Sequence, residues 1–182
     1  VRKVPFSREL YIDREDFMEE PPKKYFRMFP GNEVRLMNAY FVTCNSFVKD
    51  ENGVVTEIHC TYDPASKGGN SPDGRKVKGT IHWVSAESAV DAEVRLYENI
   101  VDEEKGKLNE DGTLNYNPNS LTVLKNCKLE AALGEAVKGD KFQFLRQGYF
   151  VIDPDTTADH LVVNRIVGLR DTWAKMQKKK KQ

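Results

Sequence analysis

Hydrophobic and polar residues alternate along much of the chain, which is typical of β-strands that bury one face. Across residues 54–63, Val54, Ile58 and Cys60 fall on one face, and largely polar side chains fall on the other. The preceding residues, Asp-Glu-Asn-Gly at 50–53, include an Asn-Gly pair, which adopts positive φ at little cost. The pattern therefore predicts a β-hairpin whose second strand spans 54–63 and is half-buried and antiparallel.

Short stretches rich in Val, Ile, Thr, Phe and Tyr recur along the chain, separated by Gly, Asn, Asp and Pro. Only two helical segments are predicted, one at 13–20 that ends before two prolines and one at 129–137. Because strands do not alternate regularly with helices, the pattern favours antiparallel barrels or a sandwich, and the length favours two small barrels. The predicted strands are 4–13, 33–48, 54–63, 76–85, 92–100, 121–128, 141–153 and 161–170.

The composition is that of a folded protein, since 39% of the 182 residues are hydrophobic and 31% are charged. Lys plus Arg and Asp plus Glu both number 28, so a nucleic-acid partner would have to bind a local basic patch. No apolar run approaches the roughly 18 residues of a membrane helix, and the start of the chain lacks a signal-peptide pattern. The cysteines form no C-x-x-C pair, which favours free thiols in a reducing compartment: Cys44, Cys60 and Cys127. These features predict a soluble, cytoplasmic protein.

No motif in the chain predicts an active site or a metal site. The Gly-rich stretch 66–76 lacks the G-x-x-x-x-G-K-[ST] pattern of a phosphate loop and is predicted to be a flexible hairpin loop. The basic residues at 75–78 are interpreted as strand-edge charges. The acidic stretch 102–111 lies among Gly, Lys and Asn and is predicted to be a solvated loop. The histidines do not have metal-ligand spacing: His59, His82 and His160.

Several long segments occur in the same order in one protein family: VPFSRELYIDREDF, EVRLMNAYFV, DGRKVKGTIHWVS, EVRLYEN, KFQFLRQGYF and NRIVGLRDTWAK. Through them, nearly the whole chain resembles the C-terminal anticodon-binding region of bacterial glutaminyl-tRNA synthetases, which are class I aminoacyl-tRNA synthetases. The resemblance implies an all-β fold of two antiparallel six-stranded β-barrels, similar to a ribosomal-protein barrel, with exchanged N-terminal strands and short helices. We expect this double barrel to span residues 1–176, and a basic, disordered tail to span 177–182.

The resemblance also implies a function. The full-length relatives ligate glutamine to its tRNA with ATP and Mg, and the HIGH-type and KMSKS-type ATP motifs of their Rossmann domain do not occur here. We therefore expect a fragment that holds no cofactor and is inactive alone. Its expected partners are the anticodon loop of glutamine tRNAs and an N-terminal catalytic domain of the same polypeptide. We expect a monomer that does not bind membranes.

Two other functions stay open. The same domain of a glutamyl-tRNA synthetase would show a different anticodon preference. A stand-alone β-barrel that binds RNA or protein would be indifferent to the anticodon sequence. An independent enzyme is the weakest alternative, because no catalytic motif supports it.

Three stretches combine basic, amide and aromatic residues, as sites for single-stranded RNA do: 23–27, 33–38 and 141–147. Arginine offers a planar fork for a base edge or a phosphate, and glutamine offers a donor and an acceptor together. Within the first stretch, Lys24 is a candidate anticodon-binding residue.

The resemblance implies roles for four further residues in these stretches. It places a contact to the third anticodon base on Arg27 and an approach to the first base on Arg35. It places contacts to the central uracil on Gln143 and Arg146.

Structural interpretations of some of these residues stay open. Arg35 also suits the solvent side of a strand, and Lys23 and Lys24 also suit a solvated pair. Two neighbouring positions depart from the family pattern, because Phe26 stands where relatives often have lysine and Met37 where they often have arginine. Neither side chain replaces a positive charge, although either could pack against a base.

Overall fold

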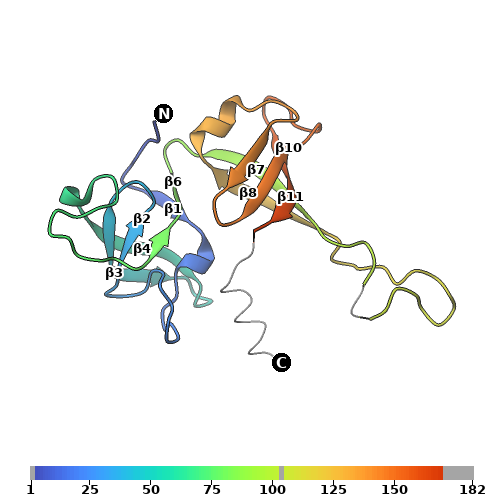
Figure 1. Cartoon of the computed structure of the whole chain (residues 1–182), viewed down its shortest axis with the longest axis horizontal. Coiled ribbons are helices and arrows are strands. Elements are labelled where there is room, and N and C mark those ends of the chain that lie inside the picture. The colour runs from blue at the N-terminus through green and yellow to red at the C-terminus, as the bar shows by residue number, and fades with distance from the viewer. Residues whose placement is uncertain (1–2, 103–104, 170–182) are drawn as a thin grey trace. The chain divides into compact units, whose positions relative to one another are not determined.

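A computed structural model of the chain describes residues 3–102 and 105–169 (Figure 1). The described residues fall into two compact units, which divide between Ser88 and Ala89. Their regular structure is almost entirely β, which confirms the all-β prediction. None of the described helices is long and apolar enough to cross a membrane. The predicted basic tail at 177–182 lies outside the described residues.

The first unit contains a four-stranded sheet in the order β4-β3-β2-β5 and a separate two-stranded pair, β1-β6. The predicted hairpin is confirmed, since β3 and β4 are antiparallel and Gly53 has a φ of 77° in the turn between them. The half-buried character predicted for its second strand is wrong, because no residue of β4 is buried and Cys60 is exposed. The elements of this unit are β1 (Leu10–Ile12), η1 (Arg14–Asp16), β2 (Glu33–Leu36), β3 (Phe41–Lys49), β4 (Val55–Asp63), η2 (Pro64–Ser66), β5 (Thr80–Ile81) and β6 (Trp83–Ser85).

The core of the first unit follows the alternation of the sequence. In β2, Val34 and Leu36 are buried, and they pack in one cluster with Ile81 and Trp83. The intervening Arg35 is only partly buried, because successive side chains of a strand point to opposite faces. The packing of the core therefore fixes the face on which this candidate arginine lies.

The second unit contains one five-stranded sheet in the order β8-β7-β11-β10-β9. The connection 98–120 between β7 and β8 extends away from this sheet (Figure 1). The described part of the acidic stretch 102–111 lies in this connection and is largely exposed, as predicted for a solvated loop. The elements of this unit are β7 (Val90–Tyr97), β8 (Leu121–Leu129), η3 (Ala131–Glu135), β9 (Lys141–Phe144), β10 (Gly148–Ile152) and β11 (Leu161–Gly168).

Four predicted strands are clearly wrong in extent. The segment 4–13 contains only β1, and 76–85 divides into β5 and β6. The other two fold back on themselves as hairpins. The segment 33–48 turns between β2 and β3, where Asn38 has a φ of 56°. The segment 141–153 turns between β9 and β10, where Arg146 has a φ of 71°. A positive φ cannot continue an extended strand, so both residues mark the point at which the chain reverses.

Both predicted helices are shorter than expected. The segment 13–20 contains only the three-residue 3₁₀ helix η1, and the segment 129–137 contains the five-residue 3₁₀ helix η3. Gly134 lies within η3, and glycine disfavours continuation of a helix. The helices therefore serve as short connections between strands.

The strand pairing is mixed. Most described pairs are antiparallel, but β2 pairs with β5 and β7 pairs with β11 in parallel, which the antiparallel expectation did not include. Parallel partners need a long crossover connection, and hairpins occupy the chain between the members of both pairs. The six-stranded barrels, the exchange of N-terminal strands and the domain boundaries stay predictions.

Candidate nucleic-acid interface

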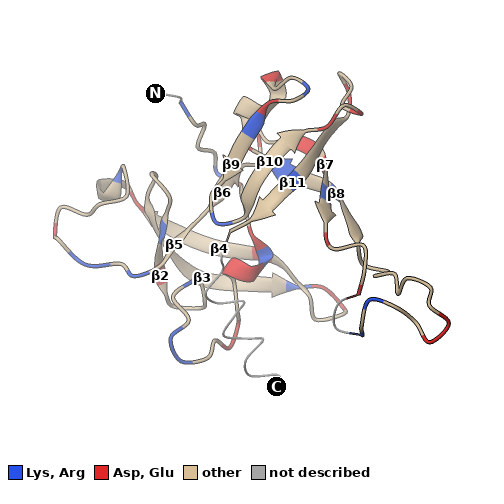
Figure 2. Cartoon of the chain, turned by 45° about the vertical axis from the view of Figure 1, so that its right-hand side comes forward, with Lys and Arg blue, Asp and Glu red and all other residues tan. Residues whose placement is uncertain are grey.

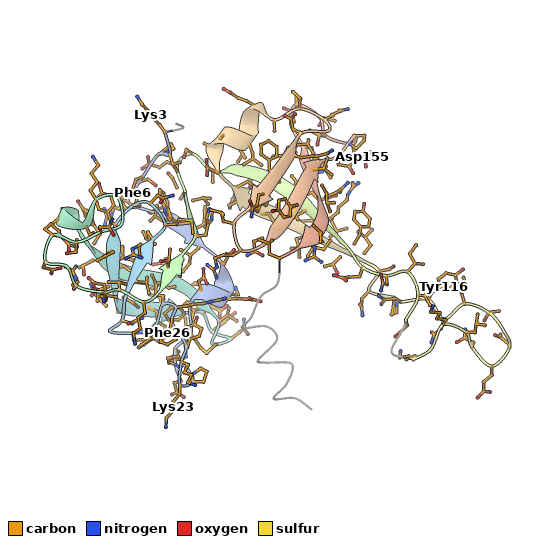
Figure 3. The ribbon with its side chains drawn as sticks, in the orientation of Figure 1. Lys3, Phe6, Lys23, Phe26, Tyr116 and Asp155 are labelled. Atoms are coloured by element: carbon orange, nitrogen blue, oxygen red, sulfur yellow. The ribbon has the colours of Figure 1, made fainter. Side chains whose placement is uncertain are left out.

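The first candidate stretch lies in the loop between η1 and β2. Lys24 is exposed and has a φ of 71°, and Lys23 points away from the unit at the tip of this loop (Figure 3). Tyr25 is buried and its hydroxyl donates to the backbone oxygen of Glu15 at 2.9 Å. A buried aromatic anchor thus presents two lysines to solvent, in an arrangement suited to a phosphate.

Arg27 lies in the same loop, but its side chain is only 16% exposed. Its Nη1 lies 3.3 Å from Oδ1 of Asp16, whose side chain is fully buried. The same nitrogen donates to the backbone oxygen of Glu15 at 3.3 Å. A buried carboxylate without a cation is costly, so Arg27 stabilises the fold whatever else it contacts.

Arg35 is held along the surface of its sheet. Its guanidinium carbon lies 5.2 Å from the centre of the buried Phe41 ring, and its Nη1 donates to Oγ1 of Thr80 at 3.4 Å. Its Cδ lies close to Gly69, where an added Cβ would come within 3.1 Å of it. Its Nε is buried and has no hydrogen-bond partner within the described part of the chain. These contacts fix the side chain beside the Gly-rich loop.

Arg75 explains why the Gly-rich loop returns to the sheet at this point. Its guanidinium binds the carboxylates of Glu33, Asp63 and Asp73 at 2.6–2.9 Å, and it also lies over the Phe41 ring. These hydrogen bonds, with that to Glu33 the strongest influence, raise the pKa of Arg75. The structure therefore supports a structural interpretation of Arg75, which bridges three carboxylates.

The loop around Arg75 also changes the pKa of Asp73, one of the acidic residues that Arg75 binds. Hydrogen bonds from the Ser71 hydroxyl, and then from Arg75, lower the pKa of Asp73 to about 2. Asp73 is therefore ionised throughout the neutral range. Within the Gly-rich stretch Arg75 pairs with Asp73, and it also binds Glu33 and Asp63, which lie outside the stretch.

The two departures from the family pattern lie in different environments. Phe26 is 52% exposed, and Nζ of Lys78 lies 5.4 Å from the centre of its ring. A lysine ammonium is thus present beside Phe26, although it comes from a distant part of the sequence, which is why the sequence analysis missed it. Met37 is partly buried, and its backbone oxygen accepts a hydrogen bond from the indole of Trp83 at 3.0 Å.

The third candidate stretch forms a single hairpin in the second unit. Gln143 is exposed on β9, which is an edge strand of its sheet. Arg146 lies in the turn, which is closed by a hydrogen bond from the Gln147 backbone nitrogen to the Phe144 oxygen at 3.0 Å. The structure therefore places the two residues predicted to contact one base within one β9–β10 hairpin.

The five predicted residues are divided between the units. Lys24, Arg27 and Arg35 belong to the first unit, and Gln143 and Arg146 belong to the second. Basic and acidic positions are interspersed in both units (Figure 2). Any nucleic-acid contact must therefore depend on the local arrangement of side chains, as the zero net charge already requires.

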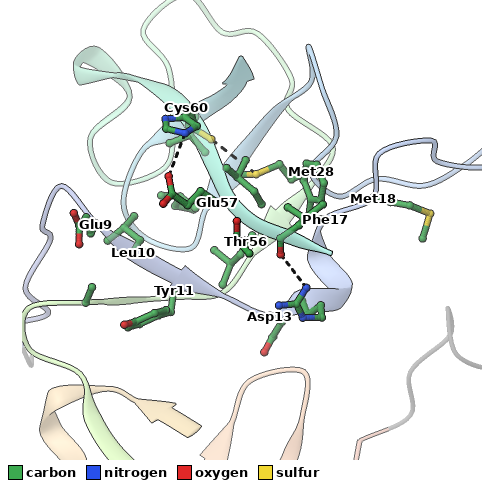
Figure 4. A pocket seen from close by; sticks show the side chains of 18 of the residues that line it. Glu9, Leu10, Tyr11, Asp13, Phe17, Met18, Met28, Thr56, Glu57 and Cys60 are labelled. Atoms are coloured by element: carbon green, nitrogen blue, oxygen red, sulfur yellow. Dashed lines mark hydrogen bonds and ion pairs between the residues drawn. The ribbon is translucent and has the colours of Figure 1, made fainter. Parts of the chain in front are cut away.

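The first unit also contains a cavity of about 1120 Å³ beside β1 and β4 (Figure 4). Sγ of Cys60 lies 3.9 Å from Sδ of Met28 there, and Nε2 of His59 lies 3.4 Å from Glu57. Burial, and then the neighbouring Cys44, raise the pKa of the Cys60 thiol to about 12. A thiol with a raised pKa is a weaker nucleophile, which disfavours Cys60 as the nucleophile of a covalent active site.

No group of three or more His, Cys, Asp or Glu side chains is arranged to hold a metal ion within residues 3–102 and 105–169. What these residues offer is instead an exposed amide, several cations and exposed aromatic rings. Such side chains suit the edges, phosphates and faces of unpaired bases.

Comparison with known proteins shows which protein families the chain is similar to. Two families, both described as "tRNA synthetases class I (E and Q), anti-codon binding domain", match the chain, one over residues 1–63 and the other over residues 80–153. The first match lies within the first unit, and the second covers most of the second unit.

Three curated relatives are named glutamine–tRNA ligases. The protein from Clostridium kluyveri is 54% identical over 176 residues, covering 95% of this chain and 32% of the relative. The protein from Clostridium perfringens is 56% identical over 177 residues (94% and 31%), and that from Rhodopirellula baltica is 50% identical over 184 residues (100% and 30%). The chain spans about a third of the length of these relatives. It belongs to the anticodon-binding domains of the class I tRNA synthetases of the E and Q group.

Proposed function

We propose that this chain recognises the anticodon loop of glutamine tRNAs, as the C-terminal part of a glutamine–tRNA ligase. The observation that carries the proposal is the exposed Gln143 beside Arg146 on the β9–β10 hairpin of a chain with this family membership. An amide and a guanidinium together can hydrogen-bond the edge of a base and neutralise its phosphate. The names of the relatives favour glutamine over glutamate.

The other candidate residues contribute from the first unit. Lys24 is proposed to contact a phosphate of the loop, since it is exposed at the end of a turn. Arg27 and Arg35 are proposed to present the outer edges of guanidinium groups that the fold already holds in place. Preorganised donors lose little conformational freedom when they bind, which favours selectivity.

The complete protein is proposed to ligate glutamine to its tRNA in the cytoplasm as a monomer, with ATP and Mg bound by a catalytic domain N-terminal to this chain. In that arrangement, the chain supplies binding energy and specificity at a distance from the reacting atoms. Isolated, it should not activate an amino acid.

The test is fluorescence anisotropy of the 182-residue chain with anticodon stem-loops at fixed low salt. The stem-loops carry CUG or UUG, or one of these with a single base changed. We expect Gln143→Ala to weaken cognate binding by about 1–3 kcal/mol, and to reduce discrimination at the central base, because one bidentate base contact is lost.

Asn119→Ala is the control, since Asn119 is an exposed amide of the same unit that lies on the connection 98–120, outside the candidate stretches. It should bind as the unchanged chain does. If Gln143→Ala lost the same affinity for every anticodon, Gln143 would not have the proposed role in selecting the central base. Equal binding of the unchanged chain to all loops would favour a general RNA-binding domain.

A further inference from the structure

The outer face of the β9–β10 hairpin carries an exposed aromatic ring in register with Gln143. Tyr149 of β10 is the register partner of Gln143 on β9 and of Val167 on β11. Side chains directly opposite each other on antiparallel strands share one face, with Cβ atoms about 4.5–5.5 Å apart. Tyr149 is 44% exposed and Val167 is 54% exposed, so an apolar strip continues outward from the amide.

The core does not account for this ring. The inner face of the same strands is filled by phenylalanines, of which Phe144 and Phe150 are stacked with ring centres 4.3 Å apart. Tyr149 alternates with Phe150 along β10 and therefore points away from that core. The stacked pair joins β9 and β10 on the core side of the sheet, opposite the face that carries Tyr149.

The charge around the ring suits a polyanion. Lys141 is exposed on the same face of β9 as Gln143, two residues away. Arg146 lies in the turn that joins the two strands. The sequences of β9, β10 and β11 contain no Asp or Glu. A ring, an amide and a lysine on one face, with an arginine in the adjoining turn, match the face, edge and phosphate of a single unpaired nucleotide.

We infer that Tyr149 is the platform on which an unpaired RNA base stacks while Gln143 reads the edge of that base. Lys141 lies where it can neutralise the adjoining phosphate. The inference rests on the proposed function and adds a residue to it. Every base has a π-face, so Tyr149 supplies affinity, whereas Gln143 supplies the choice of base.

The test compares variants of Tyr149 in the 182-residue chain by anisotropy with the cognate stem-loop. Loss of stacking in Tyr149→Ala should weaken binding by about 5- to 150-fold, with the ratio between cognate and mismatched loops retained. Tyr149→Phe keeps the ring and should bind within about twofold of the unchanged chain. Tyr149→Leu keeps an apolar side chain without the ring and should resemble Tyr149→Ala.

Tyr116→Ala is the matched control, because Tyr116 is 65% exposed on the connection 98–120 of the same unit (Figure 3). It should not change the affinity. A second measurement does not depend on the variants folding well: the unchanged chain is photo-crosslinked to a stem-loop with 4-thiouridine at the central position. The crosslink should map by mass spectrometry to the peptide that contains Tyr149.

The two proposals fail in different ways. If the unchanged chain selects its anticodon but Tyr149→Ala binds equally well, or the crosslink maps only elsewhere, the stacking role is overturned and the proposed function stands. If the unchanged chain does not distinguish anticodons, the proposed function itself is overturned.

Discussion

Arg27 is a residue for which a predicted role in recognition and an observed role in the fold coincide. The resemblance to the family predicts that it contacts a base, and the structure places its guanidinium 3.3 Å from the fully buried Asp16. The two roles make different demands, since one concerns the bound RNA and the other the folded chain alone. A loss of RNA binding on substitution of Arg27 therefore cannot be interpreted until stability has been measured.

We predict that Arg27→Ala lowers the free energy of unfolding by about 3 kcal/mol, because it leaves a buried carboxylate without its cation. Urea denaturation without RNA measures this change. Lys24→Ala, an exposed change in the same loop, is the control and should stay within about 0.5 kcal/mol. The double variant Asp16→Asn/Arg27→Gln, which removes both charges, should recover part of the loss. A cost below about 1 kcal/mol for Arg27→Ala would contradict the pairing.

At the scale of elements, the β9–β10 hairpin approaches the neighbouring strand β11 closely at one residue. Gly148 begins β10, and an added Cβ there would come within 2.4 Å of the Val167 backbone oxygen. Its register partner Gly168 has no atom within 4 Å of the corresponding position. Two glycines that face each other across the same pair of strands thus differ in whether a side chain would fit at their position.

We predict that Gly148→Ala lowers the free energy of unfolding by about 1–3 kcal/mol, because β10 and β11 must separate to admit the methyl group. Gly168→Ala should change it by no more than about 0.5 kcal/mol. Urea denaturation of both variants tests the difference. Equal stability of the two variants would show that the strands adjust freely at this point.

The sequence predicts the elements of this fold better than their ends. The hairpin at 50–53 is confirmed because Asn-Gly specifies a turn through local conformation. The turns at Asn38 and Arg146 were missed, since arginine in particular carries no local preference for positive φ and the surrounding pairing imposes it. Candidate residues were found by type and by resemblance, whereas the contacts of Arg27 with Asp16 and of Phe26 with Lys78 depend on the folded chain.

For the whole molecule, the balance of 28 basic and 28 acidic residues limits non-specific attraction to RNA. Binding then depends on a few phosphate contacts, each of which releases counterions from the RNA. Interspersed charges of both signs in each unit are consistent with this picture (Figure 2). Selectivity benefits, because RNAs without a fitting loop are not held by a general positive field.

We predict that the logarithm of the binding constant falls linearly with the logarithm of salt concentration, and that Lys141→Ala reduces the magnitude of that slope by about 0.7, the value for one phosphate contact on a single strand. Anisotropy titrations at several salt concentrations measure the slopes. Lys105→Ala, at an exposed position on the connection 98–120, is the control and should leave the slope unchanged. An unchanged slope for Lys141→Ala would exclude its phosphate contact.

The ion pair of Arg27 with Asp16 also bears on how such chains evolve. A descendant that no longer needed to bind RNA would still need a cation beside its buried aspartate. Selection for folding alone would then retain the arginine. Gln143 is exposed, so other residues could replace it without loss of stability. Among duplicated or reassigned copies, the identity of the residue at 143 should therefore report a change of RNA partner sooner than the residue at 27.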